Sequence, residues 1–137
     1  MVYPGVETVT PVLLYARYIR LAWIEARPIV QFIFLLRFLT AAAVVVAFTG
    51  ELPVVPLVTG AAAWLCATWF VYLLNGLCDQ VEDHGNGSTR PVATGALPVE
   101  AGRLIAVTLA LAAVFLAVLA TRWLVVHVLA LLVLGWA

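Results

Sequence analysis

Long apolar runs separated by short polar breaks make up most of this chain. Residues 29–49 and residues 54–74 are almost continuously apolar. At a rise of about 1.5 Å per helical residue, either run can cross the roughly 30 Å hydrocarbon core of a bilayer. Two further apolar runs follow after a polar segment. The pattern therefore predicts four membrane helices, at 29–49, 54–84, 103–120 and 123–137.

The second and fourth of these helices depart from a simple crossing. Nothing breaks the helical pattern of the second until Gly85, so residues 75–84 are expected to continue it beyond the bilayer. A polar loop is then predicted at residues 85–98, which are rich in Gly, Ser, Thr and Pro. The run 123–137 is too short to cross, and no polar tail follows it. We therefore expect the last helix to be incomplete and the chain to be a fragment.

Residues 1–28 form a leader of mixed polarity. Within it, Val12, Tyr15, Ile19 and Trp23 recur at helical spacing, with arginines elsewhere around the wheel. This pattern is typical of a helix lying along a membrane surface. An ordinary juxtamembrane segment with an aromatic anchor is the alternative. Pro28 suits the first turn of the helix that follows.

Composition excludes a soluble domain. Of the 137 residues, 66% are hydrophobic and 10% are charged. Soluble domains contain about 25% charged residues, and one of this size could not bury so much apolar surface. A net charge of zero gives no field to attract nucleic acid. The predicted fold class is all-α, a multi-pass transmembrane helix bundle.

The arginines predict the orientation of this bundle. Five lie on one predicted side, in the leader and around the polar loop: Arg17, Arg20, Arg27, Arg90 and Arg103. Arg122 alone occupies a loop on the other side. By the positive-inside rule, the leader and the 85–98 loop face the cytoplasm of a cell-membrane protein.

Polar groups are concentrated where the second helix leaves the bilayer. Asn75, Asp79 and Asp83 are spaced i, i+4, i+8, and each step of four turns a helix by about 40°. The three side chains therefore share one stripe, with Glu82 beside it. Like charges at this spacing destabilise a helix, and more so near lipid. A divalent cation would relieve the repulsion, and carboxylate and amide oxygens suit Mg²⁺.

Other interpretations of the same residues remain open at this point. The acids could form a solvated helix end, which is the usual role of a charge cluster. Alternatively, Asp79 and Asp83 could pair with Arg90 and Arg103 as a loop clamp. Asn75 could be an amide in the helix interior with no functional role. Spacing alone does not decide between these interpretations and a metal site.

The full pattern N-x3-D-x3-D-x2-N-x3-R-P-x3-G resembles the first signature of the UbiA family of membrane prenyltransferases. Its matching positions are Asn75, Asp79, Asp83, Asn86, Arg90, Pro91 and Gly95. A weaker resemblance lies in Ala26-Arg27-Pro28 before the first membrane helix. The similarity covers the chain at the level of helix order, whereas family members are nine-helix bundles of roughly twice its length.

The resemblance implies a reaction and a set of roles. The family transfers a prenyl group from prenyl diphosphate to a lipophilic, often aromatic, acceptor, with Mg²⁺ as cofactor. It implies that Asp79, Asp83 and Asn75 are the catalytic and metal-binding residues. It also implies diphosphate contacts from Arg90 and Asn86.

Two features depart from the family pattern. Gly76 replaces an acid that often follows the motif asparagine. More seriously, the chain contains no Asp or Glu after Arg103, so the family's second aspartate-rich signature is missing. We expect the chain to be incomplete as a catalyst, unless a second chain supplies that half. The alternative is a truncated, non-catalytic four-helix membrane protein with a structural or partner-binding role.

Arg37 is the remaining candidate. It lies in the middle of the first predicted membrane helix, and arginines at such depth are commonly functional. A diphosphate contact is one interpretation. A structural pairing or an arginine that reaches the membrane surface is the other.

Overall fold

The computed structural model describes residues 10–136, and in this range the protein is entirely helical apart from turns and loops. The six helices are α1 Pro11–Glu25, α2 Pro28–Thr49, α3 Val54–Cys78, α4 Gln80–Gly85, α5 Val99–Ala120 and α6 Arg122–Trp136. The predicted all-α helical bundle is confirmed.

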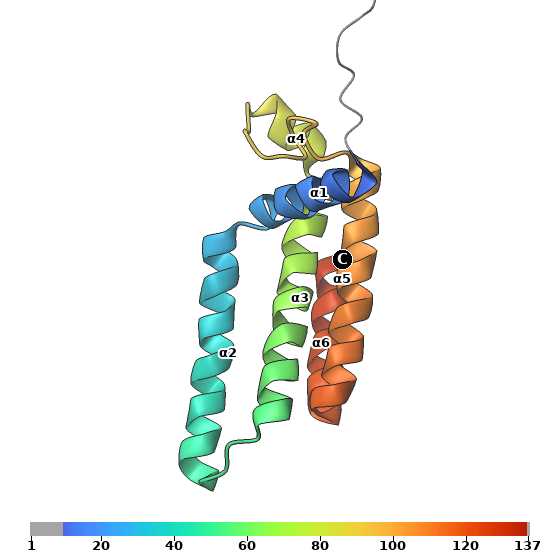
Figure 1. The fold of residues 1–137 in the computed structure, drawn as a ribbon. Coiled ribbons are helices and arrows are strands. Elements are labelled where there is room, and N and C mark those ends of the chain that lie inside the picture. Colours follow the sequence, from blue (N-terminus) through green and yellow to red (C-terminus); the bar gives the residue numbers. More distant parts are fainter. Residues whose placement is uncertain (1–9, 137) are drawn as a thin grey trace, which may run out of the picture.

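Three of the helices are long and apolar enough to cross a membrane, namely α2, α3 and α5. The fourth apolar helix, α6, has 15 residues and is shorter than a crossing requires. The protein is therefore an integral membrane protein. In Figure 1 these helices run side by side, while α1 lies across one end of the bundle and α4 lies beyond it. The end that carries α1 and α4 is called the polar end below.

The centre of the bundle is the contact of α3 with α5 and α6. Small side chains make this approach close: Ala63, Ala67, Ala113 and Ala117 are all fully buried. Membrane helices associate largely through van der Waals packing, which small residues permit at short range. Nearer the polar end, the bulkier residues Phe70, Leu73 and Leu97 complete the core.

At the polar end, hydrogen bonds join α2 to α1 and α3. Arg27 precedes it with φ of 57°, a left-handed conformation that is uncommon for a residue other than glycine, and it turns the chain from α1 into α2. Gln31, fully buried, donates to the Ala26 carbonyl oxygen at 2.9 Å. The Thr68 hydroxyl of α3 donates to Gln31 Oε1 at 2.7 Å. This chain of bonds ties the corner between α1 and α2 to α3.

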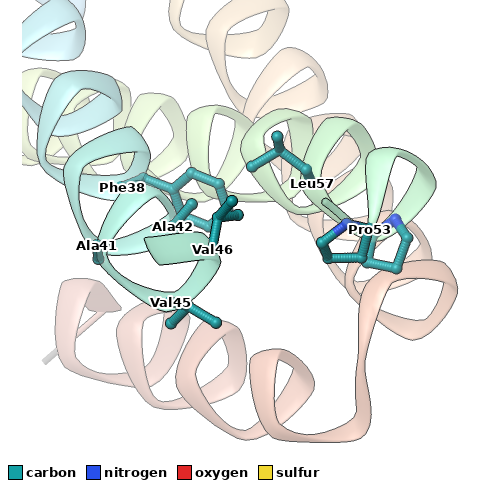
Figure 2. A pocket seen from close by; sticks show the side chains of 8 residues that line it. Phe38, Ala41, Ala42, Val45, Val46, Pro53 and Leu57 are labelled. Carbon is teal, nitrogen blue, oxygen red and sulfur yellow. The ribbon is translucent and has the colours of Figure 1, made fainter. Parts of the chain in front are cut away.

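An apolar groove separates α2 from α3 toward the other end of the bundle. Its volume is about 250 Å³. Figure 2 shows Phe38, Val46 and Leu57 among the side chains around it. Since no charged side chain lines it, this groove suits hydrocarbon and not a phosphate group.

The boundaries differ from those expected at two places. The helix expected over 54–84 is interrupted at Asp79, whose ψ of 8° departs from the helical value, so that α3 and α4 are separate. α4 also contacts the loop that follows it, as described below. α5 begins at Val99, four residues before the bound of 103 expected for the apolar run, with the helix start at Pro98 and Glu100 that the sequence also predicts.

Candidate functional site

The polar residues of the predicted stripe lie where α3 ends. Backbone hydrogen bonds continue across the break, from Asp79 N to Asn75 O at 2.9 Å and from Asp83 N to Asp79 O at 2.8 Å. The four-residue helical spacing is therefore kept through Asp79. The side chains of Asn75 and Asp79 are exposed, and neither makes a side-chain hydrogen bond or ion pair within residues 10–136. Both are available to a ligand.

Asp83 differs from these two residues because it already has a cationic partner. Its Oδ2 lies 2.7 Å from Arg90 Nη1. The Asp83 side chain is 24% exposed, and that of Arg90 is 19% exposed. A loop clamp with Arg90 was one of the alternatives that the sequence left open, and this half of it is present. Arg103 pairs instead with Glu100, at 3.1 Å on the surface.

Glu25 is a residue of the candidate site that sequence reasoning missed. It is the last residue of α1, and its side chain is fully buried. Its Oε1 lies 2.7 Å from Arg90 Nη2, and its Oε2 accepts the backbone N–H of Val92 at 2.9 Å. Ala22, Glu25 and Ala26 are spaced i, i+3, i+4, and all three are buried. Only the structure shows this burial, so no sequence signal could have identified Glu25.

Gly76 provides the space that this ion pair occupies. A Cβ at this position would overlap Glu25 Oε1 and would lie 2.8 Å from Arg90 Nη2. The absence of a side chain at Gly76 therefore has a steric reason in this chain. An acidic side chain here would collide with the buried carboxylate and repel it.

The loop between α4 and α5 folds back onto the bundle. Val92, Ala93 and Leu97 are buried, although the segment was expected to be simply polar. His84 Nδ1 lies 3.1 Å from the Ala93 carbonyl oxygen, so α4 contacts this loop as well. Asn86 is exposed and is the C-cap of α4, with its backbone N–H donating to Glu82 O at 2.9 Å.

Arg37 is far in sequence from Asp83 and Arg90, and it contacts an aromatic ring of its own helix. It is exposed in the middle of α2, and its guanidinium carbon is 5.9 Å from the centroid of the Phe34 ring. Within residues 10–136 it forms no ion pair. The structure thus brings together Asp83, Arg90 and Glu25, and leaves Arg37 outside that cluster.

The donor chemistry fits a magnesium ion that takes few ligands from the protein. No group of three or more His, Cys, Asp or Glu side chains in the described residues is arranged to hold a metal. Asn75 and Asp79 nevertheless offer free side-chain oxygen atoms, and Asp83 offers its Oδ1, since Arg90 contacts only Oδ2. Mg²⁺ is commonly held by one or two carboxylates, with phosphate and water completing its octahedron.

Comparisons of the chain with protein-family models, with curated proteins and with solved structures found no match.

Proposed function

We propose that this chain forms the first diphosphate-binding half of a Mg²⁺-dependent membrane prenyltransferase of UbiA type. The reaction would transfer a prenyl group from prenyl diphosphate to a lipophilic, often aromatic, acceptor. The observation that supports the proposal is that Asn75, Asp79 and Asp83, whose side chains carry oxygen atoms, lie at and just beyond the end of membrane helix α3, with Arg90 against Asp83.

Each residue has a role in this proposal. Asp79, Asp83 and Asn75 would hold Mg²⁺, which supplies positive charge that offsets the charge developing on the departing diphosphate. Arg90 presents a planar fork of N–H donors that matches phosphate oxygens. Asn86 and Arg37 are assigned further diphosphate contacts on the basis of the motif and of membrane depth, respectively.

The bundle suits the apolar part of such a substrate. The polar residues lie at one end, while the groove between α2 and α3 is lined by hydrocarbon. An isoprenoid tail can lie along apolar helices or in the bilayer, and a site that excludes water protects a reactive allylic cation. A second chain or segment would supply the second set of carboxylates, since this chain contains none after Arg103.

Binding measurements test the proposal. Asp79→Asn and Asp83→Asn should each weaken Mg²⁺-dependent binding of prenyl diphosphate by at least about tenfold, because each removes a charged ligand. Titration calorimetry on purified protein measures this. Glu82→Gln is the matched control, since Glu82 is exposed on the adjacent turn and should change binding less than about twofold. Unchanged binding in both aspartate variants would remove the metal role.

A non-catalytic membrane protein is the second candidate function. The observation that favours it is that Arg90 is already paired with both Asp83 and Glu25, as in a purely structural loop clamp. In that case the Asp83→Asn variant would lose stability without any change in diphosphate binding. The same titrations therefore separate the two functions.

A further inference from the structure

Glu25, at the end of α1, holds the loop between α4 and α5 in place through contacts with Arg90 and Val92. The buried carboxylate contacts Arg90 Nη2 through one oxygen and the Val92 N–H through the other. In addition, Arg90 Nη2 donates to the Glu25 backbone carbonyl at 3.3 Å. A buried carboxylate without partners is strongly unfavourable. The loop must therefore stay in place while Glu25 stays buried and charged.

The two arms of the Arg90 guanidinium lie in different surroundings. Nη2 faces a fully buried carboxylate and the C-terminal end of α1, where the negative end of the helix dipole favours a cation. Nη1 faces Asp83, which is partly exposed. Water and salt screen the exposed pair more than the buried one. The Nη1 contact is therefore the one that a ligand can replace.

We propose that Glu25 is a positioning residue for diphosphate binding. It holds Arg90 through Nη2, so that Nη1 is directed toward Asp83 and the end of α3, where a phosphate oxygen can take the place of the Asp83 carboxylate. This inference rests on the proposed function, because it requires a diphosphate at Asp79 and Asp83. Glu25 touches no reacting atom and acts through Arg90.

The first test uses the ligand-free protein and does not depend on the proposed function. Glu25→Gln keeps the side-chain volume and removes the charge. Hydrogen–deuterium exchange in residues 90–97 should become at least about tenfold faster, since the Val92 N–H and Arg90 lose their anionic partner. Glu100→Gln is the control, because Glu100 is exposed and pairs only with exposed Arg103. Unchanged exchange in Glu25→Gln would overturn the inference.

The second test measures binding of inorganic pyrophosphate in the presence of Mg²⁺. Glu25→Gln should weaken pyrophosphate binding about tenfold, and should leave the affinity for Mg²⁺ alone within about twofold of wild type. In an Arg90→Gln background, Glu25→Gln should cause no further loss, because it acts through Arg90. Additive losses, or an equal loss of Mg²⁺ affinity, would show a general structural role and overturn the positioning role.

A second variant keeps the test informative if Glu25→Gln fails to fold. Arg90→Lys retains a cation beside Glu25 but removes the second arm that reaches Asp83. We expect normal exchange at residues 90–97 with about tenfold weaker pyrophosphate binding. Normal binding in this variant would overturn the role of the Nη1 arm. If wild-type protein binds no pyrophosphate, the proposed function fails with the positioning role, while exchange still reports whether Glu25 holds the loop.

Discussion

Gly76 lies directly against the carboxylate of Glu25, with no room for even a methyl group between them. Gly76 belongs to α3, and Glu25 ends α1, so the contact joins two helices that lie across one another. The Arg90 guanidinium occupies the same space, since it too would contact a Cβ at this position. Three parts of the chain therefore meet at one ion pair, and the absent side chain of Gly76 makes the meeting possible.

Replacement of Gly76 should disrupt this contact. In Gly76→Ala the new Cβ overlaps a buried carboxylate, and we expect a loss of about 1–3 kcal/mol in the free energy of unfolding, as for an overpacked core. Gly85→Ala is the matched control, because a Cβ there meets nothing within 4 Å. Unfolding of both variants in detergent, followed by circular dichroism, measures the difference. Equal stability of the two variants would contradict the packing described here.

The bond between Thr68 and Gln31 should stabilise the docking of α2 on α3. Thr68→Val removes the hydroxyl and leaves the buried Gln31 Oε1 without its donor. We expect a loss of about 1 kcal/mol, between the average for hydrogen bonds in membranes and the cost of an unsatisfied buried acceptor. In the control Thr40→Val, the lost hydroxyl bonds only to its own helix, at Leu36 O. A change of more than about 0.5 kcal/mol in the free energy of unfolding of Thr40→Val would contradict the assignment of the Thr68→Val loss to the bond with Gln31.

Arg37 should oppose the insertion of α2 into lipid. An arginine at the centre of a membrane helix costs about 2.5–3.5 kcal/mol on insertion scales, so Arg37→Leu should favour insertion by about that amount. A glycosylation-mapping assay of α2 in the whole chain measures this.

The same Arg37→Leu variant tests the proposed diphosphate contact. We expect binding of prenyl diphosphate to weaken several-fold in the variant, with Arg122→Leu as the control at the opposite end of the bundle. Full retention of binding in Arg37→Leu would assign Arg37 a structural role.

The two cysteines allow the predicted orientation to be measured. Cys78 is exposed at the polar end of α3, whereas Cys66 is half-buried within the bundle. In a Cys66→Ala background, a membrane-impermeant maleimide should label Cys78 in inside-out vesicles and not in right-side-out vesicles, because the arginine count predicts that this end faces the cytoplasm. Cys78→Ser is the control for specificity. Labelling of Cys78 in right-side-out vesicles would contradict the predicted orientation.

Local features of this protein could be predicted from its sequence. The three long apolar helices follow from runs of hydrocarbon that match the thickness of a bilayer. The spacing of Asn75, Asp79 and Asp83 also follows, because backbone hydrogen bonds four residues apart are a local property of a helix. The interruption at Asp79 could not be predicted, since it accompanies contacts that α4 makes with a later loop.

The arrangement around Arg90 was decided only by the tertiary structure. Sequence alone determined that acids and an arginine gather after α3, and that Arg90 could serve either a ligand or a clamp. Glu25 and Val92 are 67 residues apart in the chain. The spacing of apolar and polar residues along the sequence does not predict a contact at such a separation. It forms because α1 lies across the polar end of the bundle, where Trp69 Nε1 donates to Ala22 O at 3.1 Å. Packing of α1 against α3 buries Glu25, and a buried carboxylate requires the cation that the loop provides.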